Sequence, residues 1–194
     1  MKKTIIAFAL LFLFNGIAIA EDALSLLTEG GVKSLLVSKE VFVIQVNDQV
    51  TGGCLANPGK LKDKMEISLR KKGFGIAKES GFLTNNIIIN AVGFKIGESL
   101  CAVHISAELI FATVINVPFA DNVPKGNETF VSFVYHIGNV IFTGERNSMQ
   151  SRLSKQVAEF ADKLYLDISQ SKDDIFTKFP SIKEGIMKAK DKEK

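Results

Sequence analysis

Two kinds of hydrophobic pattern alternate along this chain, and together they predict a sheet covered by helices. Residues 41–44 are consecutively apolar, which is typical of a strand covered on both faces, and the strand is expected to run to residue 46. In residues 100–117 the odd positions are mostly apolar, whereas the even positions include His104, Ser106 and Glu108. This alternation predicts a long strand with one packed face and one wetter face. Further strands are predicted at 74–78, 86–94, 129–136 and 140–143.

Two segments instead repeat their apolar residues at helical spacing. Asn57-Pro58 is a favoured start for a helix, and Gly73 is a favoured end. Within that helix the side chains expected to face the sheet recur every four residues: Leu61, Met65 and Leu69. A longer helix is predicted over 147–169, with one apolar stripe made by Met149, Leu153, Val157, Phe160, Leu164 and Ile168. A turn is expected at 137–139, and a separate short helix at 173–179.

The order of these elements predicts the fold class. Strands 41–46 and 74–78 are joined by a helix and are expected to share a sheet, and strands 86–94 and 100–117 form a hairpin. The sequence therefore predicts an α+β fold, with a mixed, mainly antiparallel sheet of about five to six strands and two long helices packed on one face. We expect a single domain over residues 21–178, followed by a polar, lysine-rich tail over 179–194.

The first twenty residues have the three parts of a secretory signal peptide. Lys2 and Lys3 precede an apolar run from residue 5 to 14, and Ala18-Ile-Ala20 is a typical cleavage site. The run is shorter than the roughly 20 residues that span a bilayer, which favours a cleaved signal over a retained anchor. We therefore expect an exported bacterial protein, periplasmic or secreted, with no transmembrane span after cleavage.

Charge then limits the choice of partners. The chain has 24 Lys and Arg against 21 Asp and Glu, and removing Lys2 and Lys3 with the signal leaves 22 against 21. This near balance removes the compositional support for a nucleic-acid partner. The remaining positive charge is concentrated in residues 60–72, which contain six basic and two acidic side chains.

Cys54 and Cys101 are the only cysteines. In an exported chain two cysteines most simply form one disulfide, whereas two free thiols or a metal pair are the alternatives. The bond would close a loop of 47 residues. Cys101 lies on the packed face of its strand, and Cys54 precedes the helix expected to cover that face, which favours the disulfide.

The predicted helix 57–72 has a second stripe opposite its apolar one. Lys60, Lys64, Ile67 and Lys71 follow each other at helical spacing, so three lysines surround one apolar side chain. The simpler interpretation is a solvated surface with a single exposed isoleucine. The alternative hypothesis is a contact surface for another envelope protein or an anionic surface.

The sequence contains no motif that names a reaction. His104 and Glu108 lie four positions apart on one strand, about 13 Å from each other, which is too far to share a metal. His136 comes near Glu108 only if the strands pair in a particular register. With no HExxH, CxxC or GxSxG motif, we expect no catalytic residue, metal or cofactor.

The order of elements behind a signal peptide resembles a group of small bacterial envelope domains. The resembling residues are the 41–46 strand, the helix end Leu69-Arg-Lys-Lys-Gly-Phe74, and the strand and helix within 129–168. Similar families are the N-terminal domain of TolB, LpoB and CsgG, which implies a non-enzymatic assembly or regulatory module. No functional residue carries over, because the resemblance lies in pattern and not in motif.

The sequence thus favours an exported envelope protein that binds another component, with Lys60, Lys64, Ile67 and Lys71 as its contact. The alternative hypothesis is a periplasmic ligand-binding or hydrolytic protein that uses the wetter sheet face around His104, Glu108 and His136.

Overall fold

The computed structural model describes residues 31–33, 35–81, 84–116, 128–180 and 183, which belong to two compact units. The larger unit covers residues 39–168, and the smaller one combines the described residues before 39 with those after 168. The predicted signal peptide lies outside the described residues, as does most of the predicted tail. Both stay predictions, and so does a single domain over 21–178.

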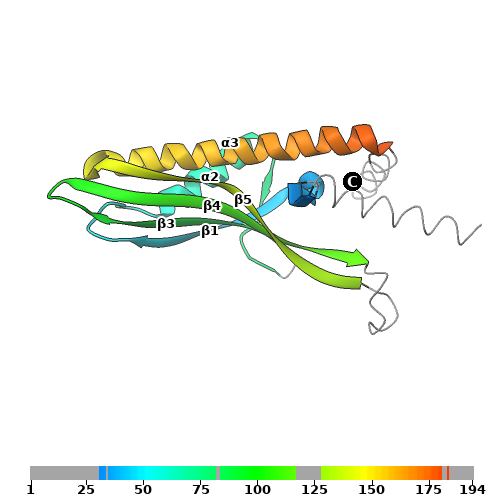
Figure 1. The fold of residues 1–194 in the computed structure, drawn as a ribbon, viewed down its shortest axis with the longest axis horizontal. Helices are drawn as coiled ribbons and strands as arrows, with labels where there is room; N and C mark the ends of the chain where they lie inside the picture. Colours follow the sequence, from blue (N-terminus) through cyan, green and yellow to red (C-terminus); the bar gives the residue numbers. More distant parts are fainter. Residues whose placement is uncertain (1–30, 34, 82–83, 117–127, 181–182, 184–194) are drawn as a thin grey trace, which may run out of the picture. The chain divides into compact units, whose positions relative to one another are not determined.

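The larger unit is built on a mixed five-stranded sheet (Figure 1). Its strands are β1 (Val41–Val50), β2 (Gly75–Ile76), β3 (Asn85–Lys95), β4 (Leu100–Asn116) and β5 (Glu128–Glu145), in the spatial order β2-β1-β3-β4-β5. β1 pairs in parallel with β2 and β3, whereas β3–β4 and β4–β5 are antiparallel. The predicted α+β class, the mixed sheet and the β3–β4 hairpin are confirmed.

The first covering helix, α2 (Gly59–Lys71), begins and ends as its sequence predicts. The Asn57 side-chain oxygen accepts a hydrogen bond from the backbone N–H of Lys60 at 3.3 Å. At the other end Gly73 has a φ of +87°, and its N–H and that of Phe74 bond back into the last turn, to Arg70 and Leu69. This is the two-bond C-terminal motif that glycine favours, because a residue with a Cβ is strained at positive φ.

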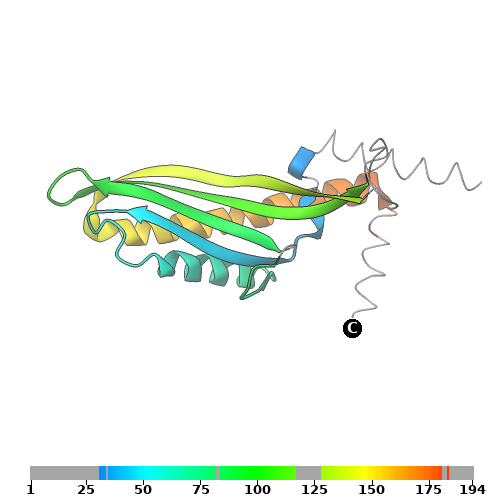
Figure 2. The ribbon, with the colours of Figure 1, turned by 90° about the horizontal axis from the view of Figure 1, so that it is seen from below.

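The helices pack on one face of the sheet (Figure 2). Leu61, Met65 and Leu69 of α2 are fully buried, as their spacing predicts. Residues Ile87, Ile89, Val103, Ile105, Ala107 and Leu109 on β3 and β4 are fully buried at alternating positions, so they form the core beneath the helices. Phe42, Val43 and Ile44 are all buried, which confirms that β1 begins as a strand covered on both faces.

The second covering helix, α3 (Arg146–Lys178), is longer than predicted. Its stripe from Met149 to Ile168 is buried as expected. The predicted break before residue 173 is wrong, because Ser171 and Ile175 continue the buried stripe at the same spacing. Position 171 is a serine, a polar residue within an otherwise apolar stripe. In the smaller unit, however, its hydroxyl donates a hydrogen bond to the carbonyl of Lys33 at 2.9 Å.

The smaller unit has few other described elements. Its described residues include a short 3-10 helix, η1 (Leu35–Ser38), with Leu36 buried. The Lys33 ammonium donates to the side-chain oxygen of Gln170 at 3.1 Å, which joins its two segments a second time. Both contacts connect residues more than 130 positions apart in the sequence.

The predicted turn at 137–139 is also wrong, because β5 is one continuous strand with a β-bulge there. The register slips by one residue opposite Ala107 and Glu108, so Ile137 is an extra residue in β5, and its side chain is buried. Gly138 then lies beneath α3, where a Cβ would come within 2.8 Å of the Phe160 ring. Glycine is present here because the helix packs close to the strand, and not because the chain turns.

Candidate functional site

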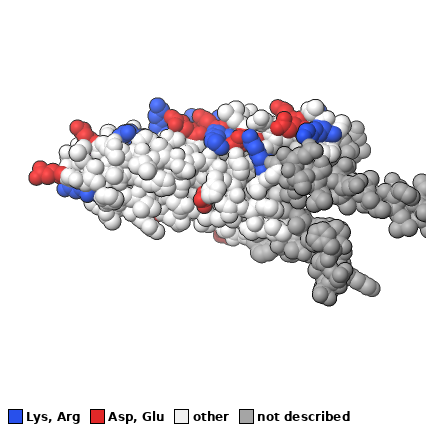
Figure 3. Space-filling view, in the orientation of Figure 1, with Lys and Arg blue, Asp and Glu red and all other residues white. Residues whose placement is uncertain are grey.

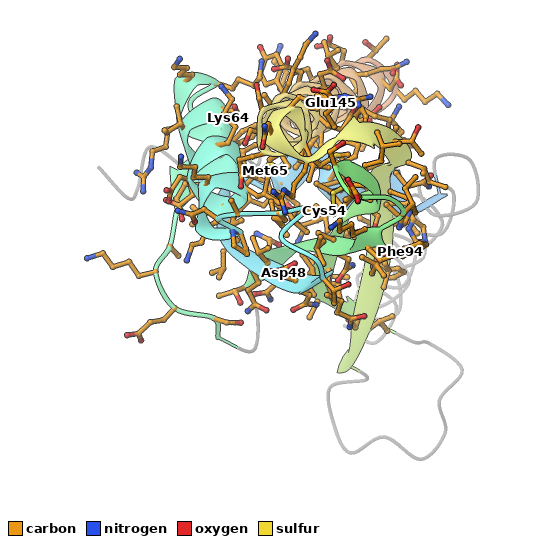
Figure 4. The ribbon with its side chains drawn as sticks, turned by 90° about the vertical axis from the view of Figure 1, so that its left-hand side faces the viewer. Asp48, Cys54, Lys64, Met65, Phe94 and Glu145 are labelled. Atoms are coloured by element: carbon orange, nitrogen blue, oxygen red, sulfur yellow. A yellow bond between two sulfur atoms is a disulfide. The ribbon has the colours of Figure 1, made fainter. Side chains whose placement is uncertain are left out.

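Cys54 and Cys101 form the disulfide that the sequence predicts. Their Cα atoms are 5.8 Å apart, and both residues are fully buried. Figure 4 shows Cys54 between the sheet and the helices. Because neither sulfur is a thiol, neither serves as a nucleophile or a metal ligand, and the alternatives left open by the sequence are excluded for the oxidised chain.

The loop before Cys54 is shaped by two glycines. Gly52 and Gly53 have φ values of +68° and +71°, a region in which side chains are strained. A Cβ at Gly52 would also lie 2.7 Å from the Cβ of Lys95. The loop therefore passes close over the end of β3, which carries Cys54 to β4 and sets the position at which α2 begins.

The four residues of the predicted contact form one exposed stripe on α2, named here the lysine stripe: Lys60, Lys64, Ile67 and Lys71. Ile67 is 50% exposed, and Figure 4 shows Lys64 on the side of α2 away from the sheet. The geometry is as expected, whereas the predicted role in binding stays a prediction.

The lysine stripe differs from the neighbouring lysines of α2 and its C-terminal end in having no acidic partner. Lys62 lies 4.0 Å from Glu66, and Lys72 forms a 2.8 Å ion pair with Asp162. No ion pair involves Lys60, Lys64 or Lys71 among the residues that the structure describes. Three ammonium groups on one face are therefore available to an external anion.

The second set of candidate residues comes together only in part. The Glu108 carboxylate of β4 lies 3.1 Å from Nδ1 of His136 on β5. The two strands therefore pair in the register that brings these residues opposite each other. His104 lies on the same face, but it is opposite Val92 and Ile141, two cross-strand rows away from the Glu108–His136 pair. Within the described part of the chain, no three His, Cys, Asp or Glu side chains are grouped so that they could hold a metal ion.

A further polar cluster on β5 and α3 escaped the sequence analysis. The Tyr135 hydroxyl donates to the Asp167 carboxylate at 2.6 Å, and the same oxygen accepts from Lys163 at 2.8 Å. Burial raises the pKa of Tyr135 well above its usual value of about 10, and the Asp167 contact raises it further. The hydrogen bond connects β5 to α3, and a phenol with a pKa raised in this way stays protonated near neutral pH.

Lys39, just before β1, is a second perturbed group. Burial lowers its pKa from the usual value, and its ammonium lies 4.7 Å from the centre of the Phe111 ring. A cation over an aromatic face is attracted by the ring quadrupole, so this contact offsets part of the desolvation cost. The contact places a cation over a buried aromatic ring of β4.

The face of the sheet opposite the helices is the surface that the sequence left least described. Strand register places its side chains in cross-strand rows, of which three are Gln45–Ile88–Glu108–His136, Asn47–Asn90–Ser106–Asn139 and Gln49–Val92–His104–Ile141. In the middle row the Asn47 amide donates to the Asn90 side-chain oxygen at 2.9 Å. The sequence does contain one sign of this surface: charged residues are scarce at the alternate positions of β3 and β4 that face away from the helices.

Comparison with known proteins does not place this chain in a family. No protein-family description and no curated protein matches it. A solved minor lipoprotein from Acinetobacter baumannii is 10% identical, with a TM-score of 0.34 over 70% of this chain and 95% of that one. A hemagglutinin homolog from Helicobacter pylori is 11% identical, with a TM-score of 0.31 over 73% and 91%. Similarity this weak carries no argument about fold or function.

The helices were also compared with the requirements of a membrane span. None of those in the described residues combines the length and the apolar composition needed to cross a bilayer.

Proposed function

We propose that this chain is an exported protein of the bacterial envelope that acts as a binding or assembly module. The disulfide supports export, because such bonds persist in oxidising compartments and are rare in the cytosol. The signal-like residues 1–20 support the same compartment.

The lysine stripe is the observation that carries the binding role. Its three ammonium groups are unpaired among the described residues, while the adjacent Lys62 and Lys72 are paired. Ile67 adds an apolar contact between them. The partner that fits this surface is an acidic protein surface with a small apolar depression, since both kinds of contact would then be satisfied.

Charge reversal tests the proposal. A triple variant with Glu at Lys60, Lys64 and Lys71 is compared with a matched variant carrying Glu at the exposed positions Lys78, Lys95 and Lys155. Each tagged protein is used to recover partners from envelope extract, which are then identified by mass spectrometry. The lysine-stripe variant should lose a partner that the control retains, and both should unfold at a temperature close to that of the wild type.

Two further results distinguish the sources of binding. Recovery should fall in 0.5 M salt, because exposed charges are screened beyond about 4 Å at that ionic strength. Equal recovery by the wild type and the lysine-stripe variant would refute the proposal. Salt-sensitive binding to phosphatidylglycerol vesicles, with no protein recovered, would assign the stripe to an anionic membrane surface.

The alternative of a ligand-binding or hydrolytic protein rests on the Glu108–His136 contact. The His136 side chain is 76% exposed on an open sheet face, whereas acid–base catalysis generally relies on a site that excludes water. Alanine at His104 and His136 tests it against p-nitrophenyl ester and phosphate substrates. Hydrolysis by the wild type that disappears in the double variant would favour the alternative.

A further inference from the structure

The side of the sheet opposite α2 and α3 has an unusual composition for an exposed surface. We define the open sheet face as the outward side chains of β1, β3, β4 and β5 that are not buried: Gln45, Asn47, Gln49, Asn86, Ile88, Asn90, Val92, Phe94, Ala102, His104, Ser106, Glu108, Ile110, Ala112, Ser132, Val134, His136, Asn139, Ile141 and Thr143. It contains no Lys, Arg or Asp, although 23% of the chain is charged. Its one carboxylate, Glu108, is already paired with His136, and Glu145 follows in the cross-strand row after Thr143, opposite Leu100 at the end of β5.

Depletion of charge is the compositional mark of a protein–protein interface core, where apolar and aromatic side chains replace Lys, Glu and Asp. In the side view of Figure 3 the charged side chains gather mainly along α3, with a few at the end that carries the β3–β4 hairpin, and few lie over the strands seen from this side. Phe94 is 58% exposed and Ile141 is 69% exposed. Large exposed apolar side chains also gather on this face and on the bordering hairpin: Val92, Phe94, Ile96, Leu100, Val134 and Ile141.

We propose that a second copy of this chain packs on the open sheet face, so that two sheets stack face to face. A two-fold symmetric interface must be complementary to itself. The central row meets this requirement, because Asn side chains carry both a donor and an acceptor and can pair with the same groups on a copy. The rows on either side are mixed: Ile88, Val92 and Ile141 offer apolar contacts, and the Gln side chains at their β1 end carry a donor and an acceptor like the central Asn side chains. Sheets stack readily at about 10 Å separation.

The available area suits such a dimer. Four strands at about 4.8 Å spacing and about ten residues of about 3.3 Å each give a flat area on the order of 600 Å² per copy. Side-chain relief increases the accessible area beyond this value. Two copies would bury about 1,200 Å² of flat area in total, which lies at the lower end of the range of specific interfaces.

Charge argues against a strongly acidic or basic occupant. The face is close to neutral, so such a partner would lose its hydration without gaining an opposite charge. A second copy brings a surface of equal neutrality. The inference does not depend on the lysine stripe, which lies on α2 on the other side of the sheet and stays accessible in both copies.

Sedimentation velocity of the chain without residues 1–20 tests the proposal. The wild type should sediment as a dimer at tens of micromolar, and Ile141→Lys should weaken the dimer by about 100-fold or more, because the new charges are buried without a partner. The matched control is Leu166→Lys, which introduces a lysine at a 63% exposed leucine of α3 and should leave the dimer unchanged. Circular dichroism verifies that each variant is folded.

Three results would overturn the proposal. One is a wild type that stays monomeric at several hundred micromolar, which would mean that the face is solvated or occupied by another part of the chain. Another is a dimer unaffected by both Ile141→Lys and Phe94→Lys, where Phe94 provides a second exposed position should Ile141→Lys not fold. The third is dissociation by Leu166→Lys, which would move the interface to α3.

Discussion

Replacing Cys54 and Cys101 with alanine should lower the free energy of unfolding by about 4 kcal/mol. The disulfide joins residues 47 positions apart. Cross-linking a loop of this length removes conformational entropy from the unfolded chain, and the chain-entropy relation gives about 4 kcal/mol at 25 °C. The bond also joins the loop before α2 to β4, so its loss should loosen the start of that helix.

Urea unfolding followed by far-ultraviolet circular dichroism measures this difference, since the chain has no tryptophan to report by fluorescence. With a denaturant slope of about 2 kcal/mol per molar, a loss of 4 kcal/mol moves the midpoint by about 2 M. Reduced wild-type protein should lose a similar amount. The reductant itself should not change the alanine variant, which is the control for nonspecific effects.

A loss below about 1 kcal/mol would refute this reasoning, because it would mean that the unfolded chain is already restricted near these residues. Hydrogen exchange gives an independent measurement. In the alanine variant the amide hydrogens in the first turns of α2 should exchange faster than they do in the wild type. The exchange of the β4 amides should change less, because the pairing of β4 with β3 and β5 does not need the disulfide.

Two further predictions concern the contact between α3 and β5. Gly138→Ala should lower the free energy of unfolding in urea by about 1–3 kcal/mol, because the new Cβ would lie 2.8 Å from the Phe160 ring. The control Gly97→Ala, whose Cβ would make only ordinary contacts, should lower it by less than about 0.5 kcal/mol. Equal losses in the two variants would contradict the close approach of α3 to β5. The raised pKa of Tyr135 means that the unfolded chain releases this proton first, so stability should fall as pH rises above about 10. Tyr135→Phe should show a smaller fall between pH 10 and 12, and identical slopes would disprove the assignment.

The two proposed surfaces would reinforce each other. A dimer formed through the open sheet face carries two copies of the lysine stripe, one on each α2. Two linked sites bind a multivalent partner more tightly than either site alone, because the second contact forms at high effective concentration. The dissociating variant Ile141→Lys should then also reduce partner recovery from envelope extract, without changing any residue of the lysine stripe.

Patterns that depend on one element were readable from the sequence. The buried stripe of α2 and its exposed lysine stripe follow from the 3.6-residue helical repeat, which assigns each side chain to one side of one helix. The disulfide was readable because two cysteines permit a single intramolecular pairing. The length of α3 was misjudged because Ser171 is satisfied by a hydrogen bond to the carbonyl of Lys33, a partner remote in sequence.

Only the tertiary structure decided how neighbouring strands align. A slip of one residue moves every side chain of a strand to the other face, and no local sequence signal sets that slip. The bulge at Ile137 sets it in β5, where it brings His136 opposite Glu108 and returns Asn139 and Ile141 to the same face. The sequence by itself therefore predicted the disulfide and the buried and exposed sides of the helices, and it is the basis for expecting an exported protein. The register decided that side chains from four strands, with Glu108 as the one carboxylate among them, form one continuous open surface.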